Sequence, residues 1–267
     1  MHYKRCADAL VLSNLTGDNA VFRCFRMRPS SFFAFGVGTY QNAGDMNCHL
    51  PTFFVRVCLS LMNYGHRVCE LGCAVPYLLA NGKLPGKVLK RVGFPTPMLL
   101  DPDAWVPREL FLTLVNALSS ATDDPHCGIH IGEMESIAQF DAFGETILAA
   151  PTLRAAIGVA CRRTALIQTG TEIRLNENRL TARLSYSFLG RTGENPAQYV
   201  QGVLVFFQKV LALTGQSAVL KVSFDHVPSQ KSQELERVFG PQLAFRAEEN
   251  AVVFGKNRRE IYRDSWV

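Results

Sequence analysis

The sequence lacks a large charge excess, a long uninterrupted apolar run and the local motifs of common catalytic sites. Charged residues make up 19% of the 267 residues, and the formal net charge is only +5. Residues 1–85 carry eight basic and four acidic side chains, whereas residues 86–267 carry twenty and nineteen. The larger part therefore has no basic excess of the kind that binds a phosphate backbone, and we expect no direct DNA binding by this chain.

The distribution of apolar residues also indicates neither a membrane-spanning segment nor a secretory leader. The longest apolar stretch, residues 53–80, is interrupted by Arg56, Arg67 and Glu70, whereas a span needs roughly 20 predominantly apolar residues. The first ten residues, MHYKRCADAL, contain no sustained apolar segment. We therefore expect a cytoplasmic protein without membrane attachment, whose cysteines are free thiols.

No nucleophile–base motif is present either. The sequence contains no GxSxG, no GxxxxGK[ST] and no set of kinase motifs. Asp225 and His226 are adjacent, but an acid–base pair needs a nearby nucleophile, and a histidine at the end of a strand more often packs or caps. We expect that the protein is not an enzyme and uses no cofactor.

Several possible ligand pairs remain open as alternatives. Cys69 and Cys73 have the spacing of half a metal site, but a closed zinc site needs four ligands. His126 and His130 would share one face of a helix, yet the glutamate of an HExxH motif is missing between them. Gly36 and Gly38 without a helix-opening third glycine indicate a nucleotide loop only weakly. A small metal-binding protein or enzyme that uses His126/His130 or Cys69/Cys73 is the alternative function.

Periodicity predicts helices in the middle of the chain and strands toward its end. Apolar residues at helical spacing predict helices over 107–119, from Pro151 onward and over 196–213. Strict alternation predicts a hairpin over residues 172–188, with Leu180, Ala182, Leu184, Tyr186 and Phe188 on its apolar face. A strand over 220–224, a helix over 229–239 and a second hairpin over 242–254 follow.

This order predicts an α+β fold with helices packed on a mainly antiparallel sheet of about five strands, β-β-α-β-α-β-β in the C-terminal half. The Gly- and Pro-rich segment GKLPGKVLKRVGFPTP, which starts at Gly82, is the expected boundary. It would divide a cysteine-rich, basic region, residues 1–85, from a domain over residues 86–267.

Five segments stand in an order that is specific when taken together: VGFPTPMLLDPDAWVP (92–107), DPHCGIHIGE (124–133), FGETILAAPTLRAAI (143–157), SFDHVP (223–228) and FGPQLAFRAEENAVVFGK (239–256). From about Lys87 to Lys256 the chain resembles the N-terminal, arabinose-binding-type ligand-binding domain of AraC/XylS-like transcriptional regulators. The resemblance implies a domain that senses a small-molecule effector and forms a homodimer, or a heterodimer with an intact regulator. It also implies a helix-turn-helix DNA-binding module after this domain, which we expect to be absent here, so that the chain is truncated or isolated.

The expected ligand site lies between the hairpin and the helix that starts at Pro151. Leu184, Tyr186 and Phe188 would supply an apolar wall, and Arg162 or Arg163 would meet an anionic group of the ligand. The alternative is that the aromatic side chains are ordinary core and the arginines are solvated.

Overall fold

The structure is a computed structural model that describes residues 9–16, 19–26, 64–213, 219–227 and 232–256. The chain divides into two compact units, residues 1–62 and residues 63–267. In the first unit, strands β1 (Ala9–Thr16) and β2 (Asn19–Arg26) form an antiparallel hairpin.

The Gly36/Gly38 pair considered above falls outside these ranges. So do Cys48, His49 and Cys58, which the sequence would allow as further ligands beside Cys69 and Cys73.

The second unit is an α+β domain. Its described helices are α2 (Ala74–Ala80), α3 (Pro85–Arg91), α4 (Arg108–Thr122), α5 (Cys127–Met134), α6 (Asp141–Leu148), α7 (Leu153–Arg163), α8 (Ala197–Ala212) and α9 (Ser232–Phe239). Short 3₁₀ segments are η1 (Val68–Leu71), η2 (Thr96–Leu100), η3 (Ile137–Phe140) and η4 (Thr164–Leu166). The strands are β3 (Gly65–Arg67), β4 (Trp105–Pro107), β5 (Thr171–Glu177), β6 (Thr181–Phe188), β7 (Val219–Ser223), β8 (Leu243–Ala244) and β9 (Asn250–Gly255).

The main sheet has five strands in the order β5-β6-β9-β7-β8, and only the β7–β8 pair is parallel. The predicted first hairpin is confirmed: β5 and β6 pair from Thr171 opposite Phe188 to Glu177 opposite Ala182. Asn178 closes its turn by accepting hydrogen bonds from two backbone N–H groups. Leu180, however, lies in this turn and is 72% exposed, so its assignment to the apolar face was wrong.

The predicted second hairpin over residues 242–254 was also wrong. β9 pairs with β6 on one side and with β7 on the other, while the two-residue β8 pairs with β7. Ala251, Val252 and Phe254 are almost completely buried, and a short continuous apolar run is typical of a strand that is buried on both faces. β9 therefore lies between β6 and β7, and its closeness in sequence to residues 242–247 does not make the two segments a hairpin.

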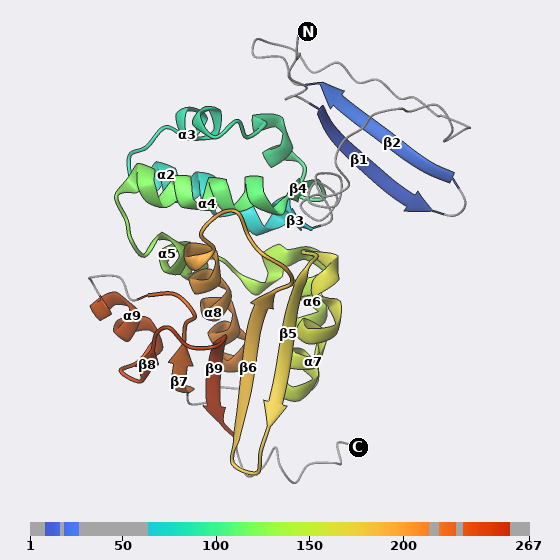
Figure 1. The fold of residues 1–267 in the computed structure, drawn as a ribbon. Helices are drawn as coiled ribbons and strands as arrows, with labels where there is room; N and C mark the ends of the chain where they lie inside the picture. Colours follow the sequence, from blue (N-terminus) through green and yellow to red (C-terminus); the bar gives the residue numbers. More distant parts are fainter. Residues whose placement is uncertain (1–8, 17–18, 27–63, 214–218, 228–231, 257–267) are drawn as a thin grey trace, which may run out of the picture. The chain divides into compact units, whose positions relative to one another are not determined.

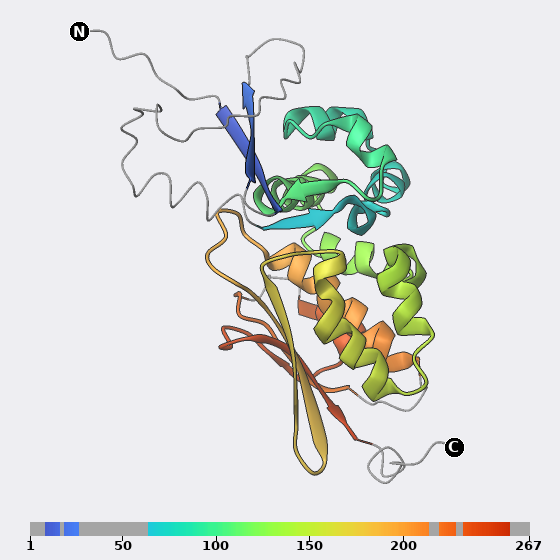
Figure 2. The same ribbon diagram turned by 90° about the vertical axis from the view of Figure 1, so that its right-hand side faces the viewer.

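The long helices cover one face of this sheet (Figures 1 and 2). Side chains of α6, α7, α8 and α9 join those of β5, β6, β7 and β9 in one hydrophobic cluster. Helix α7 starts where the sequence predicts, because the Thr152 side chain accepts a hydrogen bond from the Ala155 backbone N–H at 3.1 Å and caps its first turn. The α8 helix confirms the prediction for residues 196–213 almost to the residue.

A second hydrophobic cluster holds α2, α3 and α4 together with the small β3–β4 sheet. Phe111, Leu114 and Leu118 on the predicted stripe of α4 are almost fully buried in it. Val68, Leu71 and Tyr77, which precede the expected boundary at residues 85 and 86, belong to the same cluster.

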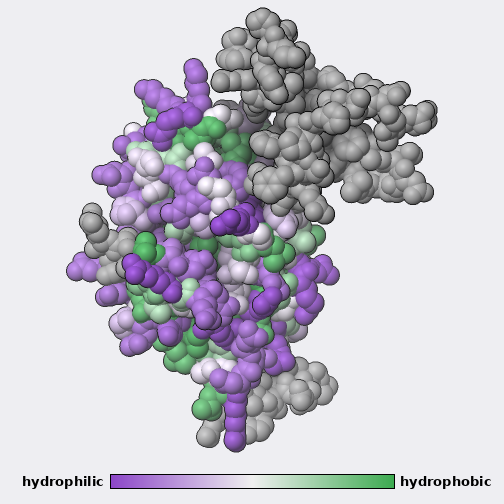
Figure 3. Space-filling view, viewed as in Figure 1, coloured by the Kyte–Doolittle hydropathy of each residue, from purple (hydrophilic) through white to green (hydrophobic). Residues whose placement is uncertain are grey.

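Hydrophilic side chains predominate on the coloured surface shown in Figure 3, with smaller apolar areas between them. Within the described residues, no helix is both long and apolar enough to cross a membrane.

Candidate functional site

A cavity of about 70 Å³ lies in the second unit, among side chains of η1, α4, α5, α8 and β5. This volume holds a few water molecules or a small organic group. Its walls are mostly apolar, with five phenylalanine rings at the lining: Phe111, Phe140, Phe143, Phe206 and Phe207. The ring of Phe206 meets that of Phe140 edge-on at 5.2 Å between centroids, an arrangement that aromatic pairs favour.

A small hydrogen-bonded network forms the polar part of the cavity wall. The Tyr199 hydroxyl donates to Oε2 of Glu70 at 2.6 Å and lies 3.0 Å from Oε1 of Gln168. The same Gln168 oxygen accepts a 2.8 Å hydrogen bond from the hydroxyl of Tyr186. Burial, reinforced by the charge of Glu70, raises the pKa of both tyrosines well above the usual range. Both hydroxyls therefore stay protonated and act as donors.

Glu70 is the most unusual member of this network, because a carboxylate is seldom buried and needs partners when it is. It is only 7% exposed. Its Oε1 lies 3.1 Å from Nδ1 of the fully buried His66, whose ring stacks on Phe111 with centroids 4.2 Å apart. The β3–η1 segment thus presents Glu70 to the cavity and keeps His66 behind it.

Thr164 contributes a buried hydroxyl without a hydrogen-bond partner. The residue follows directly on α7, lines the cavity and is 8% exposed. Within the described part of the chain, its Oγ1 contacts no donor or acceptor. A buried hydroxyl of this kind is costly unless something in the cavity binds it.

Glu135, at the C-terminal end of α5, is a second acidic residue on the lining. Burial raises its pKa to about 8, the charge of Glu70 adds to this effect, and Lys209 opposes it. The ammonium group of Lys209 donates to the backbone carbonyls of Glu133 and Glu135. The cavity therefore combines apolar walls with acidic and hydroxyl groups.

The family profile for the N-terminal arabinose-binding domain of AraC transcription regulators matches residues 82–258. This chain belongs to that family. A comparison with curated proteins gave no match. The matched range includes Glu135, Thr164, Gln168 and Tyr199, whereas Glu70 precedes it.

None of the five predicted ligand-binding residues of this AraC-type domain is on the cavity lining. Leu184 and Tyr186 are fully buried in the main core, and Phe188 is partly buried. Tyr186 reaches the cavity through its hydrogen bond to Gln168. Arg162 and Arg163 are exposed on α7, and the guanidinium group of Arg162 lies close to Gly158 of the same helix.

Buried Arg108, at the start of α4, fixes the end of the β5–β6 hairpin beside this core. Its guanidinium group donates to the backbone carbonyls of Leu189, Thr169 and Gly170. It also lies over the ring of Tyr64 at 4.2 Å from the centroid. Burial lowers the pKa of Arg108.

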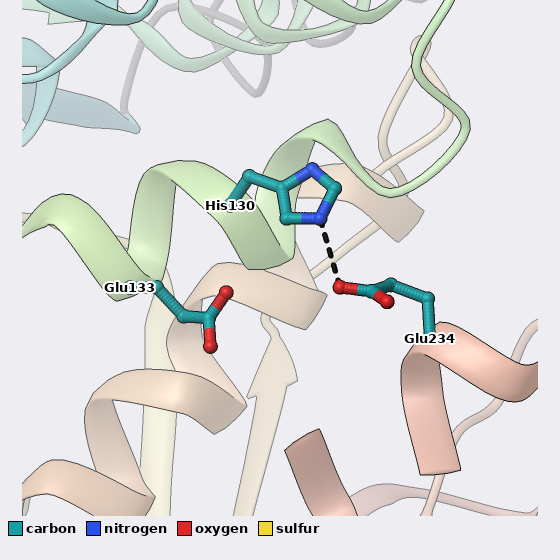
Figure 4. Close-up of side chains that lie close together, drawn as sticks. All are labelled: His130, Glu133 and Glu234. Atoms are coloured by element: carbon teal, nitrogen blue, oxygen red, sulfur yellow. Dashed lines mark hydrogen bonds and ion pairs between the residues drawn. The ribbon is translucent and has the colours of Figure 1, made fainter. Parts of the chain in front are cut away.

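The alternative metal ligands do not converge as the sequence suggested. His126 directly precedes α5 and is buried, whereas His130 is partly exposed one turn later. Among the described residues, the group with metal-ligand spacing joins His130 to Glu133 and Glu234, with neither His126 nor a cysteine in it (Figure 4).

The His130 ring lies between two carboxylates, one of which, Asp124, is not part of this group. Its Nδ1 lies 2.6 Å from Asp124 and its Nε2 lies 2.9 Å from Glu234. Desolvation alone would lower the pKa of His130, but these two partners raise it on balance. Arg237 binds both Glu133 and Glu234, so a guanidinium group already neutralises the carboxylates that a metal ion would need.

The two cysteines of the predicted half-site belong to no group with metal-ligand spacing among the described residues. Burial, with a contribution from Glu70, raises the pKa of the Cys69 thiol to about 11. Cys73 lies 3.6 Å from the amide oxygen of Gln139, and burial raises its pKa too. In the metal-free chain both thiols therefore stay protonated.

Sequence reasoning missed the polar residues of the cavity. Glu70 left a signal, because it is an acidic residue within the apolar stretch over 53–80. Tyr199 lies in the helix that apolar spacing predicts over 196–213, and periodicity does not show where its hydroxyl points. Thr164 and Gln168 lie between α7 and β5, outside any periodic segment.

Proposed function

We propose that this AraC-type domain senses a small-molecule effector that binds in the cavity beside Glu70, Thr164 and Tyr199. Family membership supports a ligand-sensing regulatory domain, and the cavity is the place in the domain that suits a ligand. Ligand sites are typically concave and mostly apolar, with a few placed polar groups. This cavity has that composition.

The buried hydroxyl of Thr164 is the observation that carries the proposal. Thr164 lines the cavity, and its hydroxyl, which is buried beside that lining, has no hydrogen-bond partner among the described residues. A ligand that reaches this hydroxyl would satisfy it, and the free energy gained would favour the bound state. The expected effector is therefore a small, mainly apolar molecule with at least one hydrogen-bonding group.

A cavity-filling variant tests the site. Ala74 is buried and lines the cavity, so Ala74→Leu would place a larger side chain in it. Ala80→Leu makes the same change at an exposed position of the same helix. We would screen a library of small amines, alcohols, carboxylates and sugars by thermal shift against the wild type and both variants.

Molecules that bind in the cavity should raise the melting temperature of the wild type and of the control variant Ala80→Leu. They should not raise the melting temperature of Ala74→Leu. A shift that persists in Ala74→Leu places the binding elsewhere. A library without any stabilising member contradicts the proposal.

The residues expected from the sequence have different parts in this proposal. Tyr186 would act through Gln168, and Leu184 and Phe188 would support the wall from behind. Arg162 and Arg163, which lie outside the cavity, would have no part in it. Arg162→Ala should therefore leave the thermal shift unchanged, and a lost shift would return the ligand site to α7.

We also propose that the domain is a cytoplasmic, non-catalytic module that signals by dimerisation, with a second copy or with an intact regulator. Family membership supports this proposal. Size-exclusion chromatography with light scattering, with and without a cavity ligand, tests it. A mass of one chain under both conditions, alone and mixed with an intact regulator, would contradict it.

A further inference from the structure

Apart from Tyr199, the ionisable residues on the cavity lining are both carboxylic acids, and Glu70 supplies the charge near neutral pH because the pKa of Glu135 is raised to about 8. No lysine, arginine or histidine lines the cavity among the described residues. His66 lies behind Glu70 and outside the lining. An anionic ligand would therefore bind beside like charge without a cation to pair with it, which is unfavourable in an apolar setting.

The neutral part of the lining is strongly aromatic. Six rings contribute to it: Phe111, Phe140, Phe143, Tyr199, Phe206 and Phe207. The face of an aromatic ring attracts a cation, and this attraction grows when the cation is desolvated. Aromatic walls around acidic groups are the chemistry that recognises alkylated ammonium groups.

Glu70 and Thr164 both have atoms that can accept a hydrogen bond from a ligand, although the threonine hydroxyl is also a donor. A carboxylate has about four lone-pair positions, and the carboxylate of Glu70 uses one toward Tyr199 and one toward His66. The Oγ1 of Thr164 adds a further acceptor without a partner among the described residues. A primary ammonium group, which has only donors, matches this set.

A sugar matches the same cavity poorly. Sugars carry hydroxyl groups on nearly every carbon and need polar partners on all sides, because a buried hydroxyl without a partner is costly. Most of this lining is phenylalanine, valine, leucine, isoleucine and glycine. Of the polar lining residues, Gln168, Gln198 and Tyr199 already make hydrogen bonds within the protein, which leaves few groups to satisfy a pentose.

We propose that the effector of this chain is a small organic cation, a branched or short alkylammonium, whose head group faces Glu70 and Thr164 and whose alkyl part contacts the aromatic rings. This inference rests on the proposed effector cavity and adds the class of ligand. It distinguishes this chain from a sugar sensor within a family named for arabinose.

Probes of one shape and different charge test the class of ligand. Isopentylamine supplies the cation, isopentyl alcohol its neutral counterpart and 4-methylpentanoate a related anion, with L-arabinose as the sugar. Binding of each to the full chain would be measured by isothermal titration calorimetry near neutral pH. We expect the amine to bind roughly ten- to hundredfold more tightly than the alcohol, the range of a charge-assisted hydrogen bond, and the anion and the sugar not to bind.

Two variants assign this preference to the cavity. Glu70→Gln keeps the shape and an acceptor but removes the charge, so the amine should lose about tenfold in affinity while the alcohol changes little. Thr164→Val, which is chosen in case Glu70→Gln does not fold, should weaken the amine as well. An amine preference that survives both variants overturns the inference.

The outcomes separate this inference from the proposed function. If the alcohol, the anion or the sugar binds more tightly than the amine and loses binding in Ala74→Leu, the cavity is an effector site but its ligand is not a cation. The same conclusion holds if the library screen yields cavity ligands of other classes and the amine does not bind. If nothing binds in the cavity, both proposals fail.

Discussion

Replacing Thr164 with valine should stabilise the ligand-free protein while it weakens effector binding. The substitution keeps the branched shape and removes a hydroxyl that has no partner among the described residues. Leaving a buried polar group unsatisfied costs roughly 1–3 kcal/mol. The surrounding structure relaxes around such a group, so we expect a gain of about 1 kcal/mol, at the lower end of that range.

Urea denaturation followed by circular dichroism measures this gain. The midpoint should rise with an unchanged slope, and the melting temperature should rise by roughly 2–4 °C per kcal/mol for a domain of this size. Thr164→Ser is the control, because it keeps the hydroxyl and loses a methyl group. Thr164→Ser should show no gain in the free energy of unfolding and should retain more ligand affinity than Thr164→Val.

Two results would refute the reasoning. If Thr164→Val loses about 1 kcal/mol or more, the hydroxyl makes an internal hydrogen bond that stabilises the fold. If serine and valine shift stability in the same direction and by the same amount, the hydroxyl has no influence on the cavity.

Three further predictions concern residues around the site. Arg108→Met should lower the free energy of unfolding by about 3 kcal/mol, measured by urea denaturation. The reason is that the backbone carbonyls of Leu189, Thr169 and Gly170 lose a buried charged donor. A loss below about 0.5 kcal/mol would contradict this. The ion pairs of His130 should stabilise the fold fully below about pH 6.5, the unfolded pKa, and less as pH rises through its raised folded pKa. The stability difference between the wild type and His130→Gln should therefore shrink as the pH rises above about 6.5, and a difference independent of pH would argue against it. Arg237→Gln should raise the Zn²⁺ affinity of the group formed by His130, Glu133 and Glu234, because the substitution frees both carboxylates from the guanidinium group. A chromophoric chelator on protein without a His-tag measures this affinity. Stoichiometric zinc in the untreated wild type would instead restore the metal-binding alternative.

The fold followed from the sequence wherever one face of an element is buried. Strict alternation over residues 172–188 predicted the β5–β6 hairpin, and the stripe of α4 predicted which of its side chains are buried. The burial of β9 could have been predicted from the run Ala251–Phe254, since a continuous apolar run is consistent with a fully buried strand. The exposed turn position of Leu180 could not, because periodicity alone does not show where a strand ends.

The candidate site was much less predictable. Its polar network joins residues far apart in the chain: Glu70 and Tyr199 are 129 positions apart. No local pattern brings η1 against α8, because that contact depends on how the two hydrophobic clusters pack. Only the unusual position of Glu70 in an apolar stretch signalled a buried charge, whereas Thr164 and Gln168 lie in a connecting segment without periodicity.

The central claim is that a small molecule binds inside the cavity of this AraC-type domain. Nuclear Overhauser effects between the tightest-binding molecule of the screen and protein with isotopically labelled phenylalanine test it most directly. The account predicts cross-peaks to the ring protons of Phe111 and Phe206, which line the cavity. Saturable binding without cross-peaks to either ring would contradict it.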